Sequence, residues 1–574
     1  MTTVALADVN GQATGRDSPH ESARLHVSGE AAYVDDLPML EGSLFAALGL
    51  SDRAHARLVD LDLNAVRSAT GVVGVLLAAD IPGNNNCGPI VADEPILAGT
   101  LVQYIGQPVF AVLADSVEHA RSAARLATIS YADLPAELSP CSAREKGSFV
   151  LPSMQRVRGD PDRAIACAPN RIAGSMQCGG QEHFYLEGQV SYAVPEEGGG
   201  IRVHCSTQHP SEMQHLIAHA LAVPANQVRI EVRRMGGGFG GKESQSALVA
   251  CVAAVATRKL GRPVKLRLDR DDDFMITGKR HDFYYDYKAG FDEQGVIKGF
   301  NVEMTSRAGF SADLSGPVMS RAICHVDNAY YLEHVAVTGF MAKTNTQSNT
   351  AFRGFGGPQG AFCIEYLIDD VARIIGSDPL DVRRRNFYGQ NERNTTHYGM
   401  TIEDNVINEL VTALEVSSEY RERRRRVTSF NAASPVLKKG LALTPVKFGI
   451  SFNMVHYNQA GALVHVYTDG SVVVNHGGTE MGQGLHTKVL QVVATELGIP
   501  IENIRITATD TSKVANTSAT AASTGSDLNG MAAKDAARTI RQRLAVVAAE
   551  RFGVTPPAVC FADGQASAAG QSMS

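Results

Sequence analysis

A strand, a glycine-rich loop and a helix follow one another in the middle of the chain, and this order constrains the fold most. The β-type run QVRIEVRR (227–234) leads into MGGGFGGKE (235–243), and the apolar run 246–260 after it suits a helix. Five glycines between a strand and a helix let the backbone bend tightly and let another group approach bare N–H groups. The loop is therefore the first candidate for a binding site.

Three interpretations of this loop compete. Gly236 to Lys242 fits the phosphate-loop pattern G-x-x-x-x-G-K, but Glu243 stands where a hydroxyl would hold magnesium. Gly236, Gly238 and Gly241 fit the pattern G-x-G-x-x-G, which would make the chain a NAD-binding Rossmann dehydrogenase. In the third interpretation the loop faces a different cofactor and Glu243 points at a reactive centre. The plain alternative is a tight turn with a solvated glutamate.

Composition excludes several classes of protein. The 574 residues suffice for three or four domains, and 44% hydrophobic with 20% charged residues is typical of a globular protein. A net charge of −7 gives no basic footprint for nucleic acid, and the run RERRRR (421–426) indicates a solvated helix face. No apolar stretch of about 18 residues predicts a membrane helix. Residues 1–18 show no signal-peptide pattern and are expected to be disordered.

The cysteines argue against metal or disulfide chemistry held by this chain. There are nine of them, and no two are spaced as C-x-x-C. That distribution disfavours a disulfide scaffold, a structural zinc site and an iron–sulfur cluster. Buried thiols in a reducing cytoplasm are the expected state.

The pattern along the chain predicts an α+β protein. Short strands and helices alternate over 18–135, which predicts a compact α/β domain, and the weakly periodic stretch 136–162 is expected to be a linker. A second domain is expected over 163–392 and a third over 393–574, where VHVYTDGSVVV (464–474) predicts a hairpin. Long helices mixed with antiparallel-type strands favour α+β over a doubly wound sheet, which counts against the dinucleotide interpretation.

Three further segments rich in glycine or other small residues echo the first loop. They read FRGFGGPQ (352–359), GGTEMGQG (477–484) and TSATAASTG (517–525). Nests of backbone N–H groups bind anions, so four such loops in one chain predict one large anionic ligand enclosed by main-chain amides. Composition and spacing reach no further than a large anionic cofactor.

These segments, together with GGQEHFYLE (179–187) and SNTAFRG (348–354), resemble in their order the molybdenum-binding subunit of the xanthine dehydrogenase family, the molybdenum hydroxylases. The resemblance runs from about residue 18 to the end. It implies a hammerhead-like α/β domain followed by two molybdopterin-binding domains, the last incomplete. It also implies FAD and 2Fe-2S clusters on a smaller partner subunit, NAD as acceptor, and a cytoplasmic dimer of two-subunit units.

The chemistry implied by the resemblance is hydroxylation of hypoxanthine and xanthine to urate. Water is the source of oxygen, and electrons leave through the 2Fe-2S clusters and FAD to NAD. Metal coordination makes an oxygen ligand acidic enough to react near neutral pH. The cofactor supplies the redox step, and the protein supplies binding and electrostatics.

The resemblance also assigns cofactor-binding positions. Gln208 is implied to hydrogen-bond an oxygen ligand of molybdenum, and Gln483 is implied to contact the pterin. No side chain need ligate the metal, because the pterin dithiolene does so. The remaining positions lie in the glycine-rich and small-residue segments, and Phe239, Arg353 and Ala522 among them are implied to line the metal: Gly238, Phe239, Gly240, Arg353, Ala521, Ala522 and Ser523.

Substrate-binding positions follow from the same resemblance. Phe355 and Phe452 match two aromatic rings that hold a flat purine, although simple core packing is the alternative for each. Glu243 and Arg321 match positions that are acidic and basic in purine oxidisers and apolar in relatives that oxidise aldehydes. Such a pair can grip the purine and stabilise charge in the transition state. The alternative for Arg321 is a surface salt bridge.

Two departures from the family pattern affect the expected activity. Asn453 stands where the family has a threonine that hydrogen-bonds substrate, so substrate preference or rate is expected to differ. The family's general base, a glutamate in a Gly-Glu-Pro-Pro segment, has no counterpart in the chain. We therefore expect a C-terminally truncated chain with impaired turnover. A non-catalytic assembly partner is the remaining alternative.

Overall fold

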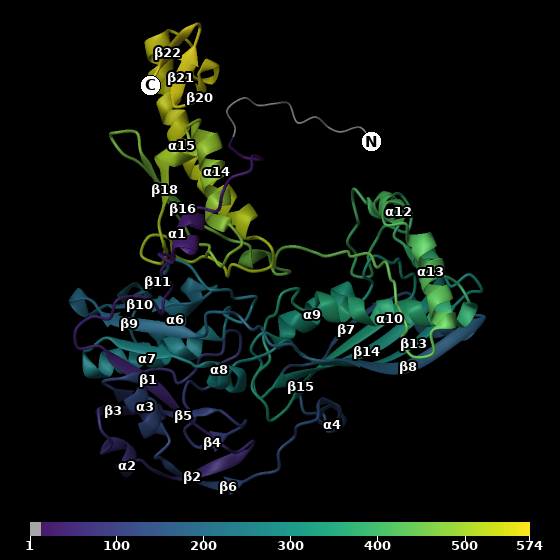
Figure 1. Ribbon diagram of the computed structural model, residues 1–574, viewed down its shortest axis with the longest axis horizontal. Coiled ribbons are helices and arrows are strands. Elements are labelled where there is room, and N and C mark those ends of the chain that lie inside the picture. Colours follow the sequence, from purple (N-terminus) through teal and green to yellow (C-terminus); the bar gives the residue numbers. More distant parts are fainter. Residues whose placement is uncertain (1–12) are drawn as a thin grey trace. The chain divides into compact units, whose positions relative to one another are not determined.

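The computed structural model describes residues 13–574 and confirms a mixed α+β architecture (Figure 1). The chain divides into two compact units, which are described separately. The first comprises Met1–Ala136, Glu182–Gly278 and Ile450–Ser574, and the second comprises Glu137–Gln181 and Lys279–Gly449. Among the described residues, no helix combines the length and the apolar character that crossing a membrane requires.

An eight-stranded mixed sheet forms the centre of the first unit. Strands β1 and β12 are parallel, as are β10 and β11, and the other neighbours are antiparallel. The expected α/β domain therefore shares one sheet with residues more than a hundred positions later. In spatial order the strands are β19 (Thr509–Asp510), β11 (Val228–Val232), β10 (Ile201–Cys205), β9 (Val190–Pro195), β12 (Val264–Arg267), β1 (Leu44–Leu50), β5 (Pro108–Ala114) and β3 (Val72–Leu77).

Two helices, α6 (Pro210–Leu221) and α7 (Ser246–Leu260), pack side by side against β9 and β11 of this sheet. The predicted helix over 246–260 is confirmed, and most of its side chains are buried. An apolar surface on all sides suits a helix enclosed between a sheet and a second helix. The helix ends at Gly261, whose left-handed φ of 64° closes its last turn.

The rest of the N-terminal region packs around the other end of the sheet. A three-stranded sheet lies beside it, and helix α3 packs on β1 and β5. The elements of this region are β2 (Ala56–Asp62), α2 (Asn64–Arg67), β4 (Leu101–Val102), α3 (Val117–Ala124) and β6 (Thr128–Asp133). Helix α1 (Ala23–Ser28) lies instead near the end of β11, where Arg234 donates to Ser22, and α8 (Arg270–Ile276) follows β12.

Ser116 provides the N-terminal cap of α3, and its removal is expected to lower stability. The backbone N–H of His119 donates to the Ser116 hydroxyl at 3.1 Å. Because Ser116→Ala leaves that donor unsatisfied, we expect the free energy of unfolding to fall by about 1 kcal/mol. Urea denaturation, followed through the unfolding of the first unit, measures this change in the free energy of unfolding. Ser116→Asp, which keeps a capping oxygen, is the matched control, and a loss as large as that of the alanine variant would contradict the capping role.

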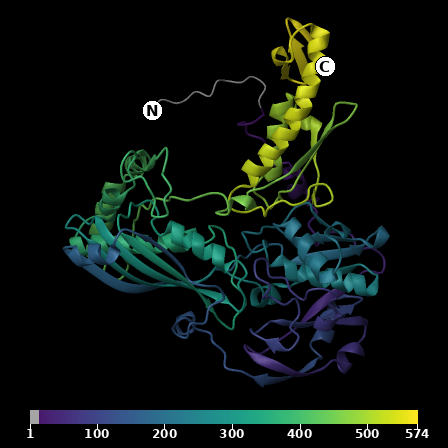
Figure 2. The same cartoon turned by 180° about the vertical axis from the view of Figure 1, so that it is seen from behind.

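A five-stranded sheet forms the second unit, with α9 (Ser315–His325) and α10 (Gly357–Ile375) packed on one face (Figures 1 and 2). Only β14 and β15 are parallel neighbours. Buried aromatic and aliphatic residues of β13 and β14 meet both helices in one core. The strand order is β7 (Met154–Arg158), β15 (Val335–Lys343), β14 (Ile297–Gly309), β13 (Phe283–Phe291) and β8 (Asn170–Cys178).

The stretch 136–162, expected to be a linker, instead belongs to the second unit. It contains α4 (Pro140–Glu145) and the edge strand β7, and α5 (Pro161–Cys167) begins at its end. An edge strand with its middle side chains exposed shows no apolar alternation, so its sequence resembles a loop.

The basic run at 421–426 lies on α13 (Tyr420–Ala433) and is partly paired within the second unit. Arg421 bonds to Asp381 and Glu415, and Arg424 bonds to Asp378. The other three arginines of the run are exposed, so this helix face is solvated as expected, while Arg421 and Arg424 are paired within the unit. The two other helices of this region are α11 (Pro379–Asn386) and α12 (Ile407–Ser417).

The C-terminal stretch of the first unit contains a small sheet with two helices. The predicted hairpin is confirmed as β16 (Ala462–Val466) and β17 (Val472–His476), with Gly470 in a left-handed turn at φ 85°. The other elements are α14 (Leu485–Leu497), β18 (Ile504–Ile506), α15 (Gly525–Phe552), β20 (Cys560–Ala562), β21 (Gln565–Ala568) and β22 (Gln571–Met573).

Residues 13–21 lie along α14, contrary to the expected disorder. The backbone N–H of Ala13 donates to Thr495 Oγ1 at 3.1 Å, and that of Glu21 donates to Thr487 Oγ1 at 2.9 Å. Backbone N–H groups of this segment are thus satisfied by threonine side chains of the helix. The rest of the expected disordered segment, residues 1–12, lies outside the described residues.

Candidate functional site

The glycine-rich loop leaves β11 and enters α7, as predicted, and its own chain holds it closely. The N–H of Gly236 donates to Glu187 Oε2 at 2.9 Å, and the N–H of Gly240 donates to Gln208 Oε1 at 2.9 Å. A Cβ at Gly238 would lie 2.6 Å from Gln208 Oε1. At this position glycine is required by a side chain of the protein itself, rather than by an approaching ligand.

Gln208 joins two of the four loops. Its backbone N–H donates to the carbonyl of Lys242 at 2.8 Å, and its carbonyl accepts from the N–H of Thr520 at 2.9 Å. Its side-chain Nε2 also donates to the Thr520 carbonyl, at 3.1 Å. The implied hydrogen bond from Gln208 to a molybdenum ligand would have to use the second Nε2 hydrogen, since the amide carries two.

Several implied cofactor or substrate positions share an unusual backbone. Phe239, Phe355, Ala522 and Ser523 have φ values of 55°, 50°, 52° and 59°. A left-handed conformation is uncommon for residues other than glycine, and such strain concentrates at ligand sites, where the surrounding structure enforces it. Phe239 is also 41% exposed, so its ring is presented outward from a buried loop.

The loop 477–484 binds its own carboxylate. Glu480 accepts from the N–H groups of Gly482 at 2.9 Å, Gly484 at 3.1 Å and His486 at 3.0 Å. Burial alone would raise the pKa of Glu480, but these N–H groups and His486 lower it, so the carboxylate stays ionised. The prediction that amides of this loop enclose an anionic cofactor is therefore wrong for the N–H groups of Gly482 and Gly484, because an internal carboxylate already binds them.

Gln483, the implied pterin contact, is exposed but folded back on its own loop. Its Oε1 accepts from the N–H of Met481 at 2.7 Å, and its Nε2 donates to the carbonyl of Thr479 at 2.9 Å. The neighbouring Gly482 has φ 102° and open space where a Cβ would lie. This part of the loop therefore keeps an uncovered backbone surface that a flat ligand could approach.

The remaining implied residues of the first unit lie at the exit of the glycine loop and in the segment after residue 450. Glu243 is buried, with 7% of its surface exposed. The N–H of Ser451 donates to the carbonyl of Ala522 at 2.9 Å, which places Phe452 and the exposed Asn453 close to the 521–523 loop. The Phe452 ring packs edge-on against the Tyr457 ring, with 6.3 Å between the ring centroids, so it has an aromatic neighbour of its own.

Arg321, Arg353 and Phe355 belong to the second unit. Arg321 lies on α9 with 4% exposure, where its guanidinium donates to the carbonyl of Gly449 and burial lowers its pKa. Phe355 is partly buried against the core of that unit, while Arg353 is exposed. Arg321 is thus not a surface salt bridge. The implied residues are divided between the two units, with Gln208, Phe239, Glu243 and the 521–523 loop held together in the first.

The segment 445–449 holds Arg321 in place from the far end of α9. The N–H of Gly449 donates to His325 Nε2 at 3.1 Å, and Lys447 Nζ lies 2.5 Å from Asp327 Oδ2. The carbonyl of Gly449 then accepts from Arg321. No local pattern signals this arrangement, because a stretch without periodicity does not reveal the helix on which it lies.

The competing interpretations of the glycine loop fail on this geometry. The Lys242 side chain is fully buried and paired with Glu187, so it cannot reach a nucleotide phosphate as the lysine of a phosphate loop does. The sheet that carries the loop is mixed, with β11 antiparallel to β19, whereas a dinucleotide fold has a mostly parallel sheet. Within residues 13–574, no group of three or more His, Cys, Asp or Glu side chains could hold a metal ion.

Two residues of this region were not singled out from the sequence, although both lie in motifs that were noted. Glu187 ends GGQEHFYLE, and Glu480 lies in GGTEMGQG. A carboxylate close to a glycine turn or a helix N-terminus is a recognisable signal, because free N–H groups gather there.

Comparison with known proteins agrees with this fold. A model described as "Molybdopterin cofactor-binding domain" matches residues 144–387, and a second with the same description matches residues 413–574. A third, "Aldehyde oxidase and xanthine dehydrogenase, a/b hammerhead domain", matches residues 28–135.

Curated relatives and solved structures give the same result. Xanthine dehydrogenase of Drosophila pseudoobscura pseudoobscura is 45% identical over 537 residues, which are 93% of this chain and 40% of the relative. Xanthine dehydrogenase/oxidase of Mus musculus is 45% identical over 531 residues, or 92% of this chain and 40% of the relative. Quinoline 2-oxidoreductase from Pseudomonas putida 86 shares the fold, with TM-score 0.86 at 24% identity over 98% of this chain and 74% of that structure.

The fold and these domain matches thus define a molybdopterin-binding chain with a hammerhead domain. The chain belongs to the molybdenum hydroxylase family of oxidoreductases, which includes xanthine dehydrogenase. It spans about 40% of the length of the curated relatives it matches.

Proposed function

We propose that the chain is the molybdenum-cofactor portion of a xanthine dehydrogenase, which hydroxylates hypoxanthine and xanthine to urate with oxygen from water. The observation that carries this proposal is the burial of both Glu243 and Arg321, which are 7% and 4% exposed. Charged side chains are rarely so buried unless they serve a partner or a ligand. An acidic and a basic group at these positions are what distinguishes purine oxidisers in the family resemblance.

The residues present fit a molybdopterin. The loops at 238–240 and 521–523 combine strained backbone with the partly exposed Phe239, and Gln208 keeps an amide hydrogen at their junction. We assign cofactor contacts to these loops, to Gln208, to Gln483 and to Arg353. When bound, the molybdenum centre supplies the oxidation of the substrate carbon.

The protein's own groups bind and polarise the purine. The Glu243 carboxylate accepts from a ring N–H, and the Arg321 guanidinium donates to a carbonyl oxygen where negative charge grows in the transition state. Phe355 and Phe452 pack against the flat ring, and Asn453 offers an amide at its edge. The 574 residues contain no Gly-Glu-Pro-Pro segment. We therefore expect slow turnover by these residues alone, since a positioned base contributes about 10²–10⁴-fold.

The electron path is assigned to a partner. The nine cysteines are all free in the structure, and their spacing does not suit an iron–sulfur cluster. We therefore assign the 2Fe-2S clusters and FAD to another subunit or region. NAD as acceptor, a cytoplasmic location and a dimer of two-subunit units are proposed from the family resemblance alone.

Molybdenum and pterin content test this function first. We expect close to one molybdenum, by elemental analysis, and one pterin, by fluorescence after oxidation, for each purified chain. Xanthine should then be converted to urate once the electron-transfer partner and a segment that carries the general base are supplied. A non-catalytic assembly partner would show stable association with the other subunit without molybdenum, and that result would overturn the proposal.

A further inference from the structure

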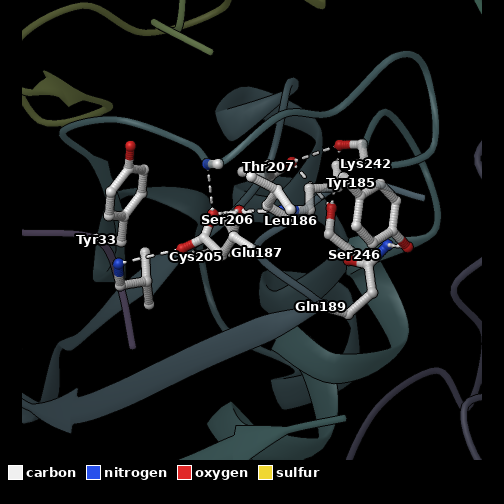
Figure 3. Close-up of polar contacts among 12 residues, drawn as sticks. Tyr33, Tyr185, Leu186, Glu187, Gln189, Cys205, Ser206, Thr207, Lys242 and Ser246 are labelled. Carbon is white, nitrogen blue, oxygen red and sulfur yellow. Dashed lines mark hydrogen bonds and ion pairs between the residues drawn. The ribbon is translucent and has the colours of Figure 1, made fainter. Parts of the chain in front are cut away.

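A fully buried ammonium group lies beneath the glycine loop. Lys242 is 0% exposed, and its Nζ lies 2.8 Å from Ser206 Oγ and 3.3 Å from Glu187 Oε2 (Figure 3). The same Nζ sits 4.7 Å from the centre of the Tyr185 ring. Burial lowers the pKa of Lys242, and the carboxylate of Glu187 opposes that shift.

Glu187 binds the opposite end of the same loop. Its Oε2 accepts from the N–H of Gly236 at 2.9 Å and from Ser206 Oγ at 2.6 Å, while its own N–H donates to the Gly236 carbonyl at 3.1 Å. Gly236 is the first glycine of the loop, and Lys242 directly follows the last one. The Lys242–Glu187 ion pair therefore links the two ends of the loop on its buried side.

Everything that the proposed function needs from this loop lies between the two ends or next to them. Phe239 holds its left-handed backbone there, and the N–H of Gly240 binds Gln208. Glu243 directly follows Lys242. A shift of either end would move the Phe239 ring, the Gln208 contact and the Glu243 carboxylate together.

Stability alone does not account for a charge pair in this position. Taking two ions out of water costs free energy that their attraction often fails to repay, and a well-packed apolar pair commonly serves stability as well. A pair of charges does, however, enforce one geometry, because each unpaired alternative leaves a buried ion. The ends of a strained loop that must hold a ligand are a place where such specificity has value.

We propose that Lys242 and Glu187 are positioning residues, which hold the glycine loop in the one conformation that presents Phe239 and Glu243 to cofactor and substrate. The inference rests on the proposed function for its catalytic consequence. Its structural part, the loop conformation, stands independently of which substrate is oxidised.

The decisive variant is the double substitution Lys242→Met and Glu187→Gln in the complete, cofactor-loaded enzyme with its partner. It removes both charges with little change of volume, because glutamine has the shape of glutamate and methionine is one atom shorter than lysine, so we expect thermal stability close to that of the wild type. We expect kcat for xanthine to fall by about 10–100-fold with a smaller change in KM, because displaced groups act mainly on the transition state. The molybdenum EPR spectrum of the partly reduced enzyme should change as well. Lys265→Met, which breaks the ion pair between the buried Lys265 of β12 and the partly exposed Asp35, is the control for loss of another ion pair and should leave kcat and the spectrum unchanged.

Hydrogen exchange separates this inference from the proposed function. In the double variant the amides of residues 236–241 should exchange faster than in the wild type, while those of α6 keep their rate. This readout does not depend on xanthine being the substrate, so an inactive wild type would count against the function only. If the double variant folds and keeps the wild-type kcat, EPR spectrum and loop exchange rates, the positioning role is overturned.

Discussion

Replacing Arg321 with methionine is expected to lower kcat/KM for xanthine by about 10²–10³-fold, the usual cost of removing one group that stabilises transition-state charge. Methionine retains an unbranched side chain that can stay buried on α9, so the packing of this 4% exposed position should survive. The measurement is steady-state urate formation by the complete, cofactor-loaded enzyme with its partner.

The comparison substrate decides how Arg321 acts. An aromatic aldehyde lacks the purine carbonyl, so its oxidation by the Arg321→Met variant should change by less than about threefold, within the range of a small repacking. Arg373→Met, at an exposed position of α10, is the control for loss of a positive charge and should leave both activities intact. Equal losses for purine and aldehyde would assign Arg321 to the fold of the unit rather than to substrate binding.

Lys447→Met is expected to lower the free energy of unfolding of the second unit by about 3–5 kcal/mol, because it strands the carboxylate of Asp327 without its main partner. Asp327 is 0% exposed and lies 2.5 Å from both Lys447 Nζ and the Tyr388 hydroxyl. The double variant Asp327→Asn with Lys447→Met removes both charges and should recover most of the loss. Urea denaturation at neutral pH measures all three proteins, and equal losses in the single and double variants would show that the charges are not coupled.

The effect should also depend on pH. Burial alone would raise the pKa of Asp327, but Lys447 and His397 outweigh it and hold that pKa below its usual value. The pair therefore stabilises the wild type above the unfolded pKa of about 3.9, and this contribution is lost as the pH falls through the lower folded value. Without Lys447 only His397 opposes the burial effect, so the pKa of Asp327 should rise. We expect the difference between Lys447→Met and wild type to shrink as the pH is lowered from 7 toward 4.

This pair matters to the site because of where the segment 445–449 leads. The carbonyl of Gly449 accepts from Arg321, and the N–H of Gly449 donates to His325. Loss of the Lys447 ion pair should therefore also release the Arg321 guanidinium. A variant that is destabilised at Asp327 is therefore expected to bind purine more weakly even at temperatures where it stays folded.

Local patterns predicted the local structure well. The strand, loop and helix around Gly236, the helix over 246–260 and the hairpin before His476 are all set by residues within a few positions of one another. The family resemblance added the molybdopterin-binding fold, which composition could not reach. The loop motifs were specific enough for that identification because several of them occur in one order.

Other features depend on partners far away in the chain. No local signal indicates that β1 pairs with β12, since strand register is decided by tertiary packing. The edge strand β7 lacked alternation because its middle side chains are exposed. At Glu480 the motif was noticed, but its carboxylate turns inward and occupies the amides that were expected to meet a cofactor.

The pairing of β1 with β12 also bears on how the protein is made. Leu44 pairs with Val264 of β12, a strand that the ribosome adds roughly 220 residues later. Synthesis of that stretch takes about 10–45 s at ordinary rates. During that interval β1 can pair with β5, but its other edge has no neighbour to cover it. A nascent chain of this kind should be a client for chaperones that shield exposed strand edges. For the same reason, residues 18–135 expressed by themselves should associate with one another, although they read as a self-contained domain.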